Sequence, residues 1–214
     1  MIEIKIDKKK FDKVIFENTK IIINDGDFIG IKGPSGAGKS TLLSIIGMLE
    51  SFEGKYYIDG NQIKPNEKVR KNNFSYIFQK PYLLPYLNVY DNLVMPLKNL
   101  KIKVDKSEIE ELAKKLGIYE LLYKYPSYLS GGECQRITIL RAFLARRKYI
   151  LIDEPTGSLD PNNSSKVLEL FKILNEEYGA TLIMVTHSND YDSYFNRRLY
   201  IDSLEIKEYD KEIS

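Results

Sequence analysis

The chain has 214 residues and a mass of 24.8 kDa, which suits one domain with room for an inserted subdomain. Hydrophobic residues make up 43% of it and charged residues 29%, a composition that favours a folded core over disorder. The formal charge of +2 gives no basis for a nucleic-acid footprint. The single cysteine, Cys134, excludes an internal disulfide, and the single histidine, His187, excludes a metal site built from several histidines.

The chain is not expected to cross a membrane by itself. Its apolar runs fall well short of the roughly 18–20 residues that a spanning helix needs. The start, Met1-Ile2-Glu3-Ile4-Lys5, has no apolar signal-peptide core. Together with the cysteine content, which suits a reducing cytosol, these features predict a cytoplasmic protein.

The first third of the chain is predicted to consist mainly of short strands. Alternating apolar and polar residues, and apolar runs bounded by turn residues, indicate such strands. They are expected at residues 2–6, 14–16, 20–23, 28–31, 54–60 and 74–78. A helical pattern runs from Ser40 to Leu49.

Between about residues 80 and 147 the pattern becomes helical. Leu and Tyr recur at helical spacing, and Pro81, Pro85 and Pro126 interrupt them. The helices are expected at residues 88–97, 106–116 and 131–145. We interpret this stretch as a helical insertion within one domain that spans residues 1–214.

Strand and helix alternate after the insertion. Strands are predicted at 149–152 and 181–185, with a helix at 161–178 between them. Two short strands, at 198–201 and 204–207, follow. Such alternation implies an α/β fold, with a parallel sheet and helices on its faces.

A glycine-rich loop follows the predicted strand that ends at Ile31. It reads Gly33-Pro34-Ser35-Gly36-Ala37-Gly38-Lys39-Ser40, with Thr41 next, and fits the pattern G-x-x-x-x-G-K-[ST] between a strand and a helix. Glycines let backbone N–H groups close around phosphate oxygens, and the helix start adds unpaired donors. Lys39 can place a cation on the β- and γ-phosphates, and the Ser40 hydroxyl can bind Mg²⁺. The alternative is a glycine-rich turn with an incidental lysine. It is disfavoured because every position of the pattern matches, and because a predicted strand and a predicted helix flank the loop.

Two carboxylates, Asp153 and Glu154, end the apolar run from Tyr149 to Ile152. Parallel sheets bind their ligands at the C-terminal ends of the strands. Asp153 can hold Mg²⁺, and Glu154 can accept a proton from the water that attacks the γ-phosphate. The alternative is a solvated strand terminus, and the phosphate loop in the same chain favours the functional interpretation.

A second glycine motif, Leu129-Ser130-Gly131-Gly132-Glu133, precedes a long helical pattern. Ser130 and Glu133 have the spacing of a capping box, a common way to start a helix. The same helix start offers bare N–H groups and the positive end of the helix dipole, which suit an anion. On these residues alone, both interpretations stay open.

The combination of Gly33 to Ser40, Leu129 to Glu133 and Ile150 to Glu154 resembles the nucleotide-binding subunit of ATP-binding cassette (ABC) transporters. The resemblance spans nearly the whole chain, and its motifs come in the family's order. It implies a P-loop NTPase with a RecA-like parallel sheet core, an N-terminal antiparallel β subdomain and an inserted helical subdomain. It also implies an ATPase that uses ATP and Mg²⁺.

The resemblance further implies a homodimer that forms as a head-to-tail ATP sandwich. Ser130, Gly131 and Gly132 of one copy would close over the γ-phosphate that Lys39 of the other copy holds. Cys134 departs from the pattern, because related chains usually carry arginine there. That departure puts in doubt any contact that the arginine would make.

Two residues after predicted strands match family positions near the reacting phosphate. Gln79 matches the glutamine that contacts Mg²⁺ and the attacking water, although a glutamine at a strand end is more often a surface residue. His187 matches the histidine on the γ-phosphate, although a lone histidine is more often structural.

Two further positions acquire candidate roles from the resemblance. Ser158-Leu159-Asp160 matches the loop that crosses the dimer interface, while Asp160 could also cap a helix that opens at Pro161. Phe11 stands where the family often has a tyrosine that stacks on adenine. Phenylalanine keeps the π-face and loses the hydroxyl, and burial in the core is the alternative.

The phrases Leu83-Leu84-Pro85, Met95-Pro96-Leu97 and Glu154-Pro155-Thr156-Gly157 resemble the branch of lipoprotein-release, macrolide-efflux, peptide-resistance and cell-division ATPases. Members pair with a separate membrane permease, which would hold this chain on the inner face of the cell membrane. Side chains between Tyr82 and Leu97 can supply the docking groove. Most are expected to pack inside the insertion, with a few, such as Tyr82, Leu83 or Tyr86, left exposed.

Two other classes of function compete with the transporter subunit. A soluble ABC ATPase acting on nucleic acid or ribosomes generally carries two cassettes or a long coiled-coil insertion, and this chain has neither. A small-molecule kinase with a phosphate loop would not need Leu129 to Gly132. The transporter subunit is therefore the leading hypothesis.

Overall fold

The structure is a computed structural model that describes residues 1–157, 161–188 and 191–209. One of its two sheets is antiparallel, with four strands in the order β2-β1-β4-β5. The strands are β1 (Ile2–Lys10), β2 (Val14–Ile23), β4 (Glu53–Ile58) and β5 (Asn61–Ile63). Ile2, Ile4 and Ile6 are buried at alternating positions of β1, so one face of this sheet packs on the core.

The other sheet has six strands in the order β10-β9-β3-β8-β7-β6. They are β3 (Phe28–Lys32), β6 (Phe74–Ile77), β7 (Tyr149–Asp153), β8 (Thr181–Val185), β9 (Arg197–Asp202) and β10 (Glu205–Glu208). The strands from β9 to β6 are parallel, and β10 pairs antiparallel with β9. The C-terminal ends of the parallel strands therefore meet at one edge, where ligands of such sheets bind.

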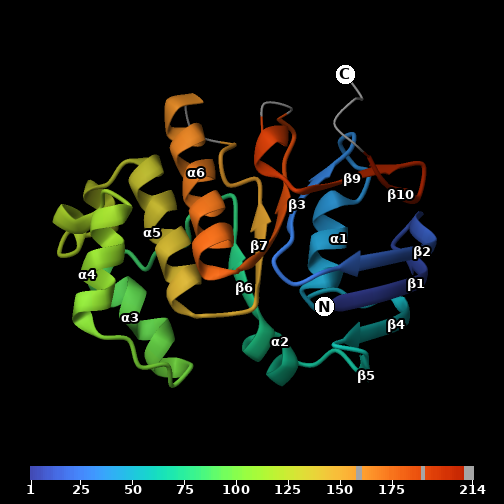
Figure 1. The fold of residues 1–214 in the computed structure, drawn as a ribbon, viewed down its shortest axis with the longest axis horizontal. Coiled ribbons are helices and arrows are strands. Elements are labelled where there is room, and N and C mark those ends of the chain that lie inside the picture. Colours follow the sequence, from blue (N-terminus) through green and yellow to red (C-terminus); the bar gives the residue numbers. More distant parts are fainter. Residues whose placement is uncertain (158–160, 189–190, 210–214) are drawn as a thin grey trace.

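Helices cover both faces of the six-stranded sheet (Figure 1). Helix α1 (Lys39–Ile46) lies between the two sheets, and its Leu42 and Ile45 belong to an apolar cluster that both sheets share. Helix α6 (Pro161–Tyr178) packs on the opposite face, where Phe171 belongs to a second cluster with residues of β7 and β8. The fold is thus layered around the parallel sheet.

The stretch between β6 and β7 is helical. It contains α3 (Val89–Asn99), α4 (Lys106–Lys115) and α5 (Gly131–Leu144), which enclose a third apolar cluster. Figure 1 shows α3 and α4 beyond α5 on the side away from the antiparallel sheet. These helices fall within the predicted insertion, whose standing as a subdomain stays a prediction. Within the described residues, no helix is both long and apolar enough to span a bilayer.

One predicted break in the antiparallel sheet is wrong. The strands expected at residues 14–16 and 20–23 form the single strand β2. Asn18, between them, has φ +48°, and pairing with β1 continues on both sides of it. Asparagine tolerates this left-handed conformation better than most residues, so the strand passes through it.

Other differences concern the end of one helix and two short elements. The helix expected to reach Leu49 ends at Ile46, where Gly47 caps it and Met48 turns to φ +58°. The short helix α2 (Glu67–Asn73) was not predicted, nor was β5. Neither contains a buried residue, so neither produces the apolar periodicity on which such predictions depend.

Candidate functional site

The phosphate loop connects β3 to α1 at the C-terminal edge of the parallel sheet. Gly33 and Gly38 have φ +146° and +101°, conformations that side chains rarely adopt. A Cβ at Gly38 would also lie 2.5 Å from Ile15 Cγ2, so both backbone and packing require glycine. Lys39 is 6% exposed, and its Nζ donates to the carbonyl oxygens of Gly33 and Pro34 at 2.9 Å each. The lysine ammonium therefore lies on the loop, as the sequence motif predicts.

The β1–β2 hairpin lies against this loop. Ile15 and Phe16 of β2 are the side chains nearest to Gly38. Phe11, between β1 and β2, is 54% exposed, so it is not the core residue of the alternative interpretation. An exposed aromatic ring thus stands on the hairpin that borders the phosphate loop.

Two acidic side chains face the start of α1 from the end of β7. Ser40 Oγ donates to Asp153 Oδ1 at 3.4 Å. Burial raises the pKa of Asp153, and the negative charge of Glu154 raises it further. Burial lowers the pKa of Lys39, although Glu154 and Asp153 favour its charged form. The Lys39 ammonium, the Ser40 hydroxyl and the two carboxylates are therefore gathered at the start of α1.

Glu154 and His187 come from neighbouring strands and meet. The Glu154 backbone has φ +45°, and its N–H donates to the Val185 carbonyl of β8 at 3.0 Å. His187 follows β8, and its Nε2 lies 2.7 Å from Glu154 Oε1. The two side chains are partly exposed, at 52% for His187 and 27% for Glu154, so solvent reaches them. This pair has the arrangement of a carboxylate base and the group that orients it.

Gln79 approaches the same acidic strand end from β6, which pairs with β7. A Cβ placed on Gly157 would lie 3.0 Å from Gln79 Nε2. The Gln79 side chain therefore lies against the turn that follows Glu154. The structure thus brings Gln79 next to the segment of Asp153 and Glu154.

The second glycine motif starts α5. Ser130 Oγ accepts from the Glu133 N–H at 3.3 Å, and Glu133 Oε2 accepts from the Ser130 N–H at 2.7 Å, which completes a capping box. The bonds that the Glu133 carboxylate accepts, from the Ser130 N–H and the Ser130 hydroxyl, lower the pKa of Glu133. The capping interpretation is therefore correct, and it leaves the anion interpretation open because Gly131 is exposed at the helix start. Figure 1 shows the starts of α5 and α1 apart, with α6 and β7 between the two helices.

Asp160, with Ser158 and Leu159, lies outside the described residues.

Two contacts around Gln79 were not predicted. Arg141 of α5 donates from Nη1 to the Tyr82 carbonyl at 2.7 Å, which ties the segment after Gln79 to the helix of the second glycine motif. The Tyr76 hydroxyl of β6 donates to the Gly47 carbonyl at the end of α1. Neither residue belongs to a phosphate-binding motif, so the sequence carried no signal for either contact.

The exposed residues expected after Gln79 are found in part. Tyr82 is 64% exposed and Tyr86 is 71% exposed. The prediction that Leu83 is exposed is wrong, because its side chain is half-buried and packs against the third apolar cluster. A leucine next to α3 gains more from that cluster than from water.

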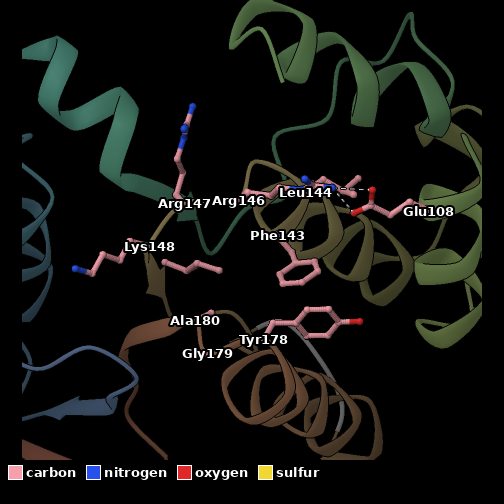
Figure 2. Close-up of a pocket in the computed structure, with 10 residues that line it drawn as sticks. Glu108, Phe143, Leu144, Arg146, Arg147, Lys148, Tyr178, Gly179 and Ala180 are labelled. Carbon is pink, nitrogen blue, oxygen red and sulfur yellow. Dashed lines mark hydrogen bonds and ion pairs between the residues drawn. The ribbon is translucent and has the colours of Figure 1, made fainter. Parts of the chain in front are cut away.

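A cavity of about 490 Å³ lies at the opposite edge of the sheet, near the start of β7. Figure 2 shows it between the ends of α5 and α6, where the rings of Phe143 and Tyr178 meet edge to face, with their centroids 4.6 Å apart. The cations on its rim are largely paired: Arg146 binds Glu108 at 2.8 Å, and Lys148 has carboxylate partners outside the cavity. None of the residues that line this cavity belongs to the phosphate loop, so the two sites are separate.

Comparison with known families finds a match over most of the chain. Residues 16–157 match the family described as ABC transporter. Residues 125–191 also match a family described as AAA domain, putative AbiEii toxin, Type IV TA system. The first match contains the phosphate loop, the second glycine motif and the acidic strand end.

Two relatives are matched over about four fifths of their own length. The chain is 36% identical over 200 residues to the bacitracin export ATP-binding protein BceA of Halalkalibacterium halodurans, covering 90% of this chain and 79% of that protein. It is 38% identical over 181 residues to the lipoprotein-releasing system ATP-binding protein LolD of Rickettsia bellii, covering 82% and 81%. Other relatives are longer, and the chain spans 66%, 58% and 31% of the length of three of them.

A solved structure agrees with this assignment. The ATP-binding cassette MJ0796 of Methanocaldococcus jannaschii, as a dimer in a post-hydrolysis state bound to ADP and Pi, superimposes with a TM-score of 0.82. The two chains are 31% identical, and the alignment covers 98% of each. The phosphate loop, the acidic strand end and these similarities lead to one conclusion: the chain belongs to the ABC transporter family, as an ATP-binding and ATP-hydrolysing subunit with the family's P-loop fold.

Proposed function

We propose that this chain drives a transporter that exports its substrate or extracts it from the membrane, and that two copies enclose ATP between them. The observation that carries the proposal is the contact of Glu154 with His187, at 2.7 Å, on the sheet edge that also holds Lys39 and Asp153. A base, its orienting partner and a phosphate-binding cation on one edge suit hydrolysis of a phosphoanhydride.

Ser40, Asp153 and Gln79 would hold Mg²⁺ in this site. The Ser40 hydroxyl and the Asp153 carboxylate lie 3.4 Å apart, and both are the oxygen ligands that Mg²⁺ takes in proteins. Gln79 lies against the same turn and can add a carbonyl oxygen. When bound, the ion would supply charge neutralisation on the β- and γ-phosphates.

The protein's own groups would carry the rest of the reaction. The backbone N–H groups of the loop from Ser35 to Thr41 and the Lys39 ammonium bind the phosphates. Glu154 accepts the proton of the water whose oxygen attacks the γ-phosphorus, and ADP leaves with the electrons of the broken bond. His187 holds Glu154 in place and reaches the γ-phosphate. Phe11 stacks on the adenine base.

A second copy would complete the site. Ser130, Gly131 and Gly132 of that copy would close over the γ-phosphate with the bare N–H groups of the α5 start. The starts of α5 and α1 lie apart in one chain, which supports a partner copy as the source of the second anion site (Figure 1). The dimeric relative MJ0796 with ADP and Pi supports the same arrangement. In that arrangement, Asp160 would lie at the dimer interface.

The partner in the membrane would be a separate permease subunit, which holds the chain on the inner face of the cell membrane. Tyr82 and Tyr86 follow Gln79 along the chain and are exposed, and the ring of Phe78, which is 42% exposed, lies 5.7 Å from that of Tyr82. Exposed aromatic rings grouped in this way mark protein–protein contact surfaces. A permease docked there would therefore sense changes at Gln79 directly.

The experiment that tests the proposal is the substitution Glu154→Gln. It removes the base and keeps the shape, so we expect unchanged ATP affinity, turnover lower by roughly 10²- to 10⁴-fold, and an ATP-dependent dimer on size-exclusion chromatography. Glu111→Gln, at an exposed position of α4, is the control and should keep full turnover. ATP turnover by the Glu154→Gln variant equal to that of the parent protein would show that Glu154 is not the base.

A further inference from the structure

A buried lysine supports the exposed ring of Phe11. Lys9, in β1, is 6% exposed, and its Nζ lies 4.2 Å from the centroid of the Phe11 ring. The same Nζ donates to the Ser51 carbonyl at 2.7 Å and lies 3.5 Å from Glu50 Oε1. The ammonium is therefore fixed under one face of a ring that is otherwise 54% exposed.

The position of this pair relative to the phosphate loop is set by the hairpin. Lys9 pairs with Phe16 across the β1–β2 ladder, and Phe16 is one of the side chains nearest to Gly38 of the loop. Glu50 and Ser51, which hold Lys9, follow helix α1, which the loop opens. The ring, its supporting cation and the loop are thus joined through packed elements.

We propose that Lys9 is a positioning residue for the base of the bound nucleotide, acting through Phe11. The inference rests on the proposed function, in which Phe11 stacks on adenine. The Lys9 ammonium occupies one face of the ring, so the other face is the one offered to a purine.

Two physical effects support this role. A cation over the negative face of an aromatic ring is attracted to it and holds the ring in one orientation. An exposed side chain that is already held in place loses less conformational freedom when a ligand binds, so binding is stronger. Glu50 lies beside the ammonium, so Lys9 does not act as a free positive charge on the phosphates.

The test measures the affinity of a non-hydrolysable ATP analogue and of inorganic tripolyphosphate, which has no base, by calorimetry. Lys9→Met removes the cation and keeps the aliphatic stem. We expect roughly two- to fivefold weaker binding of the analogue and unchanged binding of tripolyphosphate. Lys9→Arg keeps a cation and should retain most of the affinity. Lys10→Met, at the exposed next position of β1, is the matched control and should bind both ligands normally.

A double-mutant cycle separates this role from a structural one. In a Phe11→Leu background, Lys9→Met should cause no further loss of analogue affinity, because the ring through which Lys9 acts is gone. An equal loss with and without the ring, or an equal loss for tripolyphosphate, would overturn the proposal. Unchanged affinity of the Phe11→Leu variant would also overturn it. The proposed function is judged separately, by the ATP turnover of the Glu154→Gln variant, which none of the substitutions at Lys9 affects.

Discussion

The backbone of Glu154 has φ +45°, a left-handed conformation that non-glycine residues rarely adopt. Such conformations cost of order 1–3 kcal/mol and persist where the surroundings hold them. Here the Glu154 N–H is bound to Val185 O of β8, and the side chain reaches His187. The strain at one residue therefore serves to turn the carboxylate from the strand direction into the site.

A substitution at Gly131 can distinguish a structural role of the second glycine motif from a functional one. A Cβ at Gly131 would meet nothing within 4 Å, and its φ lies outside the left-handed range. The fold therefore has no need for glycine there, and Gly131→Ala should leave stability unchanged or raise it by about 0.4–1 kcal/mol.

The same Gly131→Ala variant should lose function, because in the sandwich its methyl group would stand between the helix end and the γ-phosphate. We expect normal thermal unfolding, with ATP turnover and ATP-dependent dimerisation at least roughly tenfold lower. If the variant turned over ATP as fast as the parent protein, the motif would serve only to cap α5.

At the scale of elements, the edge strand β10 is joined to the parallel sheet by a charged pair. Arg197 of β9 donates to Glu208 from Nε at 2.8 Å and from Nη2 at 3.0 Å, and it also binds Asp27. These hydrogen bonds hold the pKa of Glu208 below its ordinary value. The Glu208 side chain is 52% exposed, so solvent screening limits the contribution of the pair to about 0.5 kcal/mol.

Glu208→Gln tests this contribution through its pH dependence. Because the pKa of Glu208 is lowered in the fold, its stabilisation is complete above the pKa of an unfolded glutamate, about 4.3, and is lost as the pH falls through the folded value. We therefore expect the variant to be less stable by about 0.5 kcal/mol at pH 7, a difference that shrinks to zero in acid. Urea denaturation at several pH values measures it.

Glu205→Gln, in the same strand, is the control for Glu208→Gln. The Glu205 partner, Lys207, is 73% exposed, so the pair should contribute less. An equal pH-independent loss in both variants would contradict the assigned role of the Arg197 contacts.

At the scale of the whole molecule, the two glycine motifs of one chain open different helices. The phosphate loop opens α1 between the two sheets, while the motif from Leu129 to Glu133 opens α5 on the far side of β7 (Figure 1). In the proposed sandwich these are the two half-sites. Two copies in head-to-tail orientation would bring each α5 start to the other copy's loop. Each complete site would then draw on both copies.

This arrangement predicts that two defective variants rescue each other. Lys39→Ala removes the phosphate cation, and Gly131→Glu brings a negative charge to the γ-phosphate. Neither variant alone should dimerise with ATP. A mixture should form mixed dimers, because one of their two sites combines an intact Lys39 with an intact Gly131.

The mixed dimers can be measured by capturing one tagged variant and detecting the other, in a Glu154→Gln background that preserves ATP. A mixture of two differently tagged Lys39→Ala chains is the control and should give none. Absence of mixed dimers from the complementary pair would show that the two half-sites do not meet across the interface.

The sequence by itself determined the elements whose patterns are local. The run from Thr181 to Val185 was predicted with its final bounds, because a short run of apolar and β-branched residues is typical of a central parallel strand. The phosphate loop could be predicted for a similar reason, since its chemistry lies within nine consecutive residues from Gly33 to Thr41. Segments without a fully buried residue, such as α2, left no such pattern.

Only the tertiary structure decided which distant residues touch. Glu154 and His187 are far apart in sequence and meet because β7 and β8 pair in register. Lys9 and Phe11 are neighbours in sequence, yet the buried ammonium under an exposed ring depends on Ser51 and the packing of two sheets. A sequence pattern reports the environment of each residue along one chain segment, whereas a site depends on the directions in which several packed segments point their side chains.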